Sequence, residues 1–275
     1  MLALLALGSS IAWGASDFGA ALLAKRHRAV VVVGWTQGLA LVALTVVVAV
    51  HGWSGSGLGW VPWAGSAGIA GMLGLVCFYA ALSSGTMGVV APIASLGIIV
   101  PVTLGVAFGE RPSPWAWIGT VVAIIGVSLA SGPELSGRVS ARPLVLAMGA
   151  AVAFGAGLFC LDRGARVSML MTLWGMRATS VGLLLLVAVA ARHFGGVRAR
   201  EVPFLGLVGL GDLAANGLFA VASSQGQVSV ASVLGSLYPV VTAVLAAVVL
   251  RERMLPVQYA GSALAIAGAV VLSLG

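Results

Sequence analysis

The sequence predicts an all-α integral membrane protein with ten transmembrane helices built from two inverted five-helix repeats. The first observation is composition: 60% of the 275 residues are hydrophobic and 8% are charged, with a mean hydropathy of +1.13. The second is that apolar runs of roughly 20 residues, the length that crosses a bilayer, follow one another almost without pause. The third is a pattern that occurs in both halves of the chain. A composition this apolar lies far outside the range of soluble domains.

Short polar or basic breaks divide the chain into ten candidate spans. Strands of a membrane barrel would alternate apolar and polar residues, whereas runs such as AVVVVGWTQGLALVALTVVVAV are apolar on every face. The first span lacks a basic leader and is longer than a signal-peptide core, so we expect a retained helix. The spans are residues 2–24, 29–50, 60–82, 87–108, 114–131, 143–161, 167–191, 203–223, 228–250 and 256–274.

The two halves carry matching motifs at a nearly constant spacing. ERPSPWAWIG at residues 110–119 returns 142 positions later as ERMLPVQYAG at residues 252–261. At a spacing of 141, WGA beginning at Trp13 matches FGA beginning at Phe154. The agreement is too ordered to come from shared composition alone, and small loop insertions explain the drift in spacing.

Each half holds five spans, an odd number, so the second copy must enter the membrane from the opposite side. We therefore predict a first repeat at residues 1–138 and a second, inverted repeat at residues 139–275, within one membrane domain. Inverted repeats are a common construction of secondary transporters, whose substrate site lies near the bilayer midplane where the halves meet. Two like halves in opposite orientations can exchange conformations, which yields one outward-facing and one inward-facing state.

Ten of the fourteen basic residues gather in four loops that share one side of the predicted bundle, and the net charge of the chain is +7. The positive-inside rule makes that side cytoplasmic, so both termini are expected outside a plasma or inner cell membrane. No basic face with stacking aromatics indicates a nucleic-acid partner. The residues of these four loops are Lys25, Arg26, Arg28, Arg138, Arg142, Arg192, Arg198, Arg200, Arg251 and Arg253.

No pattern in the sequence indicates an enzyme, a metal site or a cofactor. Cys77 and Cys160 lie inside spans without neighbouring ligands, and the three histidines lie in loops with no zinc or haem spacing. A P-loop motif for ATP is absent from the sequence. An integral-membrane enzyme would need a clustered nucleophile, base or metal set, so we expect no catalytic residues and no cofactor.

Asp17 is one of the few charged residues inside a span, where a charge costs about 2.5–3.5 kcal/mol at the bilayer centre. Its counterpart at the spacing of 141 is Leu158, so the two repeats differ here. Asp17 either faces headgroups at the end of its span or lines a cavity. In the second case, it would bind a proton on one side of the membrane and release it on the other.

Arg177 lies about ten residues into the seventh span, and its counterpart at a spacing of 140 is Gln37. Two interpretations remain open. Its long side chain either reaches back to the membrane interface or stays buried beside an anion. The candidate anions are Asp17, Asp212 and the carboxylate of a substrate.

Asp212 and Asn216 are four residues apart on the eighth span and share a face among glycine and alanine. They either form an interhelical hydrogen bond or handle protons or substrate. The aromatic residues Trp13, Tyr79, Trp174 and Tyr238 offer a cavity wall with polar groups, although simple core packing explains each one equally well.

Proline and glycine point to kinks in the fourth and ninth spans. Pro101 and Pro239 each remove the hydrogen-bond partner of the carbonyl four residues earlier, at Gly97 and Gly235. We expect these four residues to act as hinges, because broken helices in corresponding halves mark binding sites and gates in transporters. Glycines at intervals of three in the third span, from Gly65 to Gly74, predict close helix packing.

Several of these motifs together resemble a known family. The WG of the first span, the GER-like corners, the P-x-x-W/Y-x-G motif after each corner, and the AxxG of spans five and ten resemble EamA-type ten-helix carriers of the drug/metabolite transporter superfamily. The resemblance covers essentially the whole chain. It implies two inverted five-helix repeats and export of small metabolites, often amino acids or drugs. Relatives are usually drawn with cytoplasmic termini, in contrast to the charge distribution here.

These observations favour a secondary transporter that exports a small organic metabolite, such as an amino acid, by alternating access. Protons are the candidate coupling ion. The protein is expected to lie in the lipid bilayer as a monomer or weak dimer. A multidrug exporter of organic cations is the alternative within transport; Asp17 and Asp212 favour it and Arg177 disfavours it. A non-transporting membrane subunit or a lipid flippase remains a further alternative.

Overall fold

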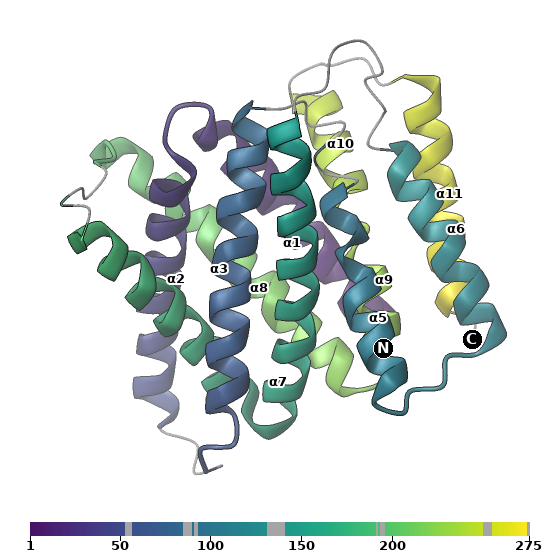
Figure 1. The fold of residues 1–275 in the computed structure, drawn as a ribbon, viewed down its shortest axis with the longest axis horizontal. Helices are drawn as coiled ribbons and strands as arrows, with labels where there is room; N and C mark the ends of the chain where they lie inside the picture. Colours follow the sequence, from purple (N-terminus) through teal and green to yellow (C-terminus); the bar gives the residue numbers. More distant parts are fainter. Residues whose placement is uncertain are drawn as a thin grey trace.

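The computed structural model describes residues 1–52, 57–84, 90, 93–130, 141–190, 192, 196–249 and 255–273. Throughout these ranges the regular elements are helices, and no strand occurs among them (Figure 1). Expectations that concern Arg138, His193, Arg251, Glu252 and Arg253 lie outside the described residues.

The helices follow one another along the chain with short connections. A chain this apolar is expected to form helices, because in lipid every backbone N–H and C=O must be paired within the protein and a helix pairs them within one segment. The elements are α1 (Leu2–Ala24), α2 (Ala29–His51), α3 (Val61–Ser84), η1 (Leu96–Ile98), α5 (Ile99–Ala107), α6 (Pro114–Ala130), α7 (Ala141–Ala190), η2 (Ala199–Glu201), α8 (Val202–Ser224), α9 (Val228–Gly235), α10 (Tyr238–Val249) and α11 (Pro256–Ser273).

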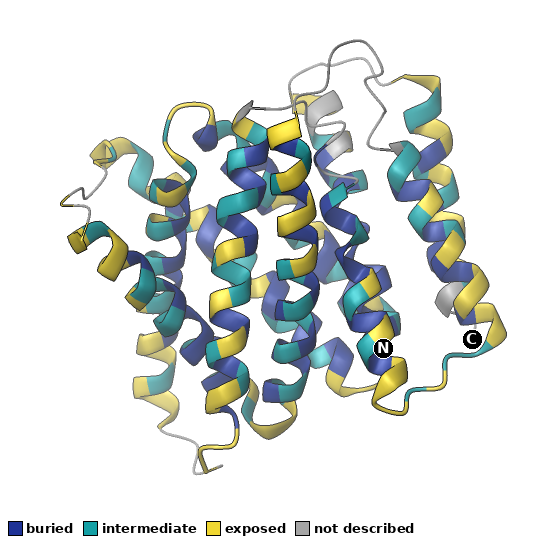
Figure 2. Ribbon diagram, viewed as in Figure 1, coloured by how far each residue is buried: buried dark blue, intermediate teal, exposed yellow. Residues whose placement is uncertain are grey.

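Five helices of the described chain are long and apolar enough to cross a membrane. They are Leu2–Ala24, Ala29–His51, Val61–Ser83, Ala141–Ala190 and Ala199–Ser224, and shorter apolar helices accompany them. Exposed and buried residues alternate along the helices at the edges of the bundle (Figure 2). On α6 the exposed side chains include Trp115, Val121 and Ile125. Apolar surface of this kind suits contact with lipid.

The long helix α7 contains a break at Ser168, where φ is −158° and ψ is 107°. The predicted sixth and seventh spans therefore meet here. We expected a loop around Arg163 and Arg166, but the chain stays helical through both residues. The ion pair between Asp162 and Arg166, four residues apart on one helix face, favours that extra helical turn.

The helices that contain Gly97 and Gly235 are interrupted at these glycines. Gly97 lies within the short 3₁₀ segment η1, and α9 ends at Gly235. Pro101 and Pro239 fall at the third and second residues of the helices that follow, where a missing N–H removes no intrahelical bond. The prolines are 138 positions apart rather than 141, so each lies at a slightly different depth in its half.

Contacts between α6 and α11 are reciprocal. The two helices pack together at one edge of the bundle (Figure 1). Gly126 lies against the backbone of Ala265, and Gly268 lies against the backbone of Ala123. The two contacts are equivalent, because at a spacing of 142 Gly126 corresponds to Gly268 and Ala123 corresponds to Ala265. Residue numbers rise along one helix as they fall along the other, so these equivalent helices are antiparallel.

A second pair of contacts is also reciprocal. One joins the first part of α7 to η1 and α5, and the other joins α1 to α10. Gly155 lies against the carbonyl of Gly97, and Gly14 lies against the carbonyl of Tyr238. Both contacts connect equivalent positions at a spacing of 141. Glycine is needed at these places because a Cβ atom would overlap the facing backbone. The first half of the chain therefore packs on the second through matched contacts made twice.

Candidate functional site

A central cavity lies where the two halves meet. Its walls come from α1, α3, both parts of α7, α8, and the two interrupted segments around Gly97 and Gly235. The empty space among these residues, counted together with the part open to solvent, is about 780 Å³.

The lining consists largely of equivalent positions from the two halves. When each residue is matched with the one 141 positions later, seven matched pairs have both members in the cavity wall. The pairs are Trp13 with Phe154, Asp17 with Leu158, Gly71 with Asp212, Leu75 with Asn216, Ala94 with Gly235, Ser95 with Ser236, and Gly97 with Tyr238. The cavity wall thus combines matched positions of the two halves of the sequence, while its chemistry differs from one half to the other.

Arg177 on α7 is the centre of a polar cluster. Its guanidinium donates to the Oε1 atom of Gln37 at 2.7 Å and to the Oδ2 atom of Asp212 at 2.8 Å. The amide of Gln37 donates to the same Asp212 oxygen at 3.2 Å. Arg177 is 2% exposed and pairs with the partly buried Asp212, so its side chain does not reach the interface. The ion pair neutralises both charges inside the bundle.

Asn216 completes the cluster from the next turn of α8. Its side-chain amide donates to the backbone carbonyl of Asp212 at 2.7 Å and to the Oδ1 atom of the same residue at 3.2 Å. The Asn216 amide therefore restrains the rotamer of Asp212, so that the carboxylate faces Arg177. The shared helix face expected from their spacing brings these two groups together.

Asp17 lies apart from that cluster. The hydroxyl of Tyr79 donates to its Oδ1 atom at 3.2 Å. Asp17 takes part in none of the ion pairs found among the described residues. The carboxylate thus lines the cavity with one hydroxyl donor and no paired cation, whereas Asp212 is fully compensated.

Two buried donors on the cavity wall have no acceptor within the described chain. They are the Nε atom of Arg177 and the hydroxyl of Tyr238. A buried donor without an acceptor costs about 1–3 kcal/mol. Both groups are therefore suited to an acceptor from outside the protein, such as a solute oxygen or water.

Eight of the thirteen residues singled out from the sequence line the cavity: Trp13, Asp17, Gly97, Arg177, Asp212, Asn216, Gly235 and Tyr238. Two more, Gln37 and Tyr79, lie behind the wall and bond to it. Trp174 does not line the cavity. Its indole N–H donates a hydrogen bond to the hydroxyl of Thr45 at 3.2 Å. Pro101 and Pro239 are not in the wall either.

Sequence reasoning missed the small lining residues. Gly71, Ser95 and Ser236 were not proposed as site residues, yet all three line the cavity. The sequence repeat could have indicated them, because at a spacing of 141 Gly71 corresponds to Asp212 and Ser95 corresponds to Ser236. A residue matched to a site residue in the other half is itself a candidate for the wall.

Comparison with known proteins agrees with this architecture. A solved structure, described as the crystal structure of a protein, matches 99% of this chain and 96% of its own with a TM-score of 0.79 at 19% identity, which establishes the fold alone. A probable terminal-alkyne amino-acid exporter of Streptantibioticus cattleyicolor is 38% identical over 101 residues. That match spans 35% of this chain and 33% of the relative, about a third of each.

The model of the EamA-like transporter family matches the chain twice, at residues 1–132 and 141–274. The two matches cover nearly all of the chain and fall on the two halves that pack reciprocally. With its apolar helices and central cavity, the chain is a multi-pass membrane protein and belongs to the EamA-like transporter family of the drug/metabolite transporter superfamily.

Proposed function

We propose that this protein is a secondary transporter that exports a small organic metabolite, an amino acid or related compound, by alternating access. The observation that carries the proposal is the central cavity, which is walled by equivalent positions of the two halves and contains Asp17 and the Arg177–Asp212 pair. The polypeptide would cross the membrane ten times, as two inverted repeats at residues 1–138 and 139–275. Antiparallel reciprocal packing of α6 on α11 supports that inversion.

The cavity suits a zwitterion with an apolar side chain. Asp17 offers a carboxylate to an ammonium group, since no cation compensates it among the described residues. The unpaired donors on Arg177 and Tyr238 offer hydrogen bonds to a carboxylate. Phe154 and Leu158 contribute apolar side chains to the cavity wall. The partial match to a protein named as an amino-acid exporter supports the same substrate class.

Asp17 is the candidate for proton coupling. The Tyr79 hydroxyl stabilises its charged form, whereas the apolar surroundings disfavour that form. Exposure of the cavity to one face and then the other would change this balance. One acid that takes a proton on one side and releases it on the other couples transport to a gradient.

Export of organic cations is the second candidate. From sequence, Arg177 argued against it because a cation in the cavity repels cationic solutes. Arg177 is paired with Asp212 at 2.8 Å, and its positive charge is therefore compensated. With Asp17, Arg177 and Asp212 all charged, the net charge of these three side chains in the cavity wall equals that of Asp17 alone.

Flux across proteoliposomes that contain the purified protein separates these functions. Vesicles are loaded with labelled apolar amino acids, with the corresponding amines, which lack the carboxylate, or with a fluorescent lipid. Gradient-dependent efflux of amino acids supports the proposal, and efflux of amines alone supports cation export. Lipid movement without solute flux would support a flippase, and absence of all three would contradict transport.

A further inference from the structure

We propose that Glu110 and Arg166 form a latch that closes one mouth of the cavity by holding the connection between α8 and α9. The latch consists of these two side chains together with Asp162, which positions Arg166. The proposal rests on the alternating-access function above and assigns these residues a role outside the cavity. The contacts come from three separated parts of the chain.

Glu110 follows α5 and binds the beginning of α9. Its Oε1 atom accepts the backbone N–H of Val228 at 2.7 Å, and its Oε2 atom accepts the N–H of Ser229 at 3.2 Å. The hydroxyl of Ser229 donates to Oε2 at 2.6 Å. A carboxylate at a helix N-terminus satisfies otherwise unpaired N–H groups and complements the helix dipole. Glu110 therefore joins a first-half residue to a second-half helix.

Arg166 binds the other side of the same connection. Its guanidinium donates to the carbonyls of Ser223 at 3.0 Å and Gly226 at 3.2 Å, where α8 ends. Two further bonds of 3.0 Å join it to both oxygens of Asp162, which is fully buried. A bidentate pair of this kind fixes the orientation of the guanidinium. The residues between α8 and α9 are thus held from both sides.

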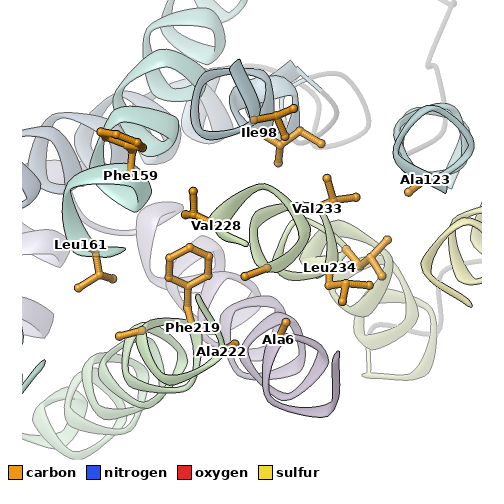
Figure 3. Packing of buried hydrophobic residues seen from close by; sticks show 14 of the residues in the cluster. Ala6, Ile98, Ala123, Phe159, Leu161, Phe219, Ala222, Val228, Val233 and Leu234 are labelled. Carbon is orange, nitrogen blue, oxygen red and sulfur yellow. The ribbon is translucent and has the colours of Figure 1, made fainter. Parts of the chain in front are cut away.

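The latch lies at the end of the bundle where α8 ends and α9 begins. Between the cavity wall and this end, the inward-facing side chains of several helices form one buried apolar cluster, which includes Ile98, Leu161 and Val228 (Figure 3). Val102 follows Ile98 of the wall, Leu161 follows Leu158, and Ala231 precedes Gly235. A solute leaving by this mouth would have to part these helices, and α9 is the one the latch holds.

The Asp162–Arg166 half of the latch occurs in one repeat only. At the spacing of 141, Asp162 and Arg166 are equivalent to Ala21 and Lys25, which have no carboxylate to pair. Reciprocal packing alone would make the two closed states similar in energy. The bonds that Arg166 donates to the carbonyls of Ser223 and Gly226 join separate helices, so they add stability to the state in which this mouth is closed and bias the population toward it.

Access of an impermeant thiol reagent to the cavity tests the latch. Gly71→Cys is a suitable reporter, because Gly71 lines the cavity and a Cβ atom there meets no other atom within 4 Å. The native Cys77 and Cys160 are replaced by alanine. In oriented vesicles that contain the full chain, the reagent is applied to the face with Glu110 or to the opposite face.

Glu110→Gln is expected to raise labelling from the Glu110 face about tenfold and to lower it from the opposite face, since loss of charge-assisted bonds shifts the population. Ser229→Ala removes one bond and leaves both backbone bonds, so a smaller change in the same direction is expected. Arg111→Gln is the matched control: it removes a neighbouring exposed charge and should leave both rates unchanged.

Faster labelling from both faces would indicate general loosening and overturn the latch, as would unchanged rates in folded Glu110→Gln and Ser229→Ala proteins. The reporter also tests the underlying function. If Gly71→Cys reacts from only one face in every variant, alternating access itself fails and the latch with it. If it reacts from both faces but ignores Glu110, only the latch is wrong.

Discussion

The two halves of the molecule agree in their packing and differ in their polar groups. Gly14 and Gly155 make the same backbone contact in opposite halves. Within the cavity, in contrast, Asp17 is matched by Leu158 and Asp212 by Gly71. The comparison teaches that close helix packing is needed in both copies, because each copy must adopt both conformations, whereas one set of polar groups is enough to bind one solute.

The matched glycines provide the test with the largest expected effect. Gly155→Val places a side chain against the backbone of Gly97, and Gly14→Val places one against that of Tyr238. Neither backbone can yield cheaply, so each variant should lose about 3 kcal/mol or more of stability. Folded yield and thermal unfolding in detergent measure this loss. Similar losses in both variants support equivalent halves, and a loss in only one would contradict that account.

Breaking the Arg177–Asp212 pair should have the next largest effect. Asp212→Asn leaves a buried guanidinium without its anion, which costs about 3–5 kcal/mol. The double variant Asp212→Asn with Arg177→Gln removes both charges and should recover much of the stability. Thermal unfolding of the single and double variants measures the coupling. A double variant less stable than Asp212→Asn alone would show that charge pairing is not the cause.

Arg177→Lys keeps the charge and should impair transport more than folding. Lysine loses the planar fork that contacts Gln37 and Asp212 together, and it loses the free Nε donor. We expect flux of an amino acid to fall about tenfold, with little change in thermal stability. Arg142→Lys, a change on the same helix but far from the cavity, is the control. Wild-type flux in Arg177→Lys would remove this residue from the substrate site.

Gly71 is expected to control the size of the transported solute with the smallest effect on stability. Its counterpart Asp212 has a side chain, whereas Gly71 leaves open space in the wall. Gly71→Val adds a side chain at a place where a Cβ atom meets no other atom within 4 Å. We expect transport of solutes with bulky side chains to fall while small ones are carried as before. Competition of amino acids of increasing size for flux measures the change, and equal inhibition at all sizes would exclude this role.

The sequence could predict the helices and most of the polar cluster. Charged groups inside apolar spans must find partners, which is why Arg177 and Asp212 meet. It could not predict that Trp174 faces Thr45 and not the cavity, because the rotation of a helix about its axis depends on neighbouring helices. The helical course through Arg166 was missed since charged residues usually mark a loop between spans.

The direct test of the account is proton-driven flux by Asp17→Asn in proteoliposomes. Asparagine has nearly the shape of aspartate and can still accept from Tyr79, but it cannot titrate. Leu158, its counterpart, is not an acid. The account predicts a folded variant that exchanges substrate across the membrane but no longer responds to a pH gradient. Wild-type dependence on the gradient in Asp17→Asn would contradict it and transfer the coupling to Asp212 or abolish it.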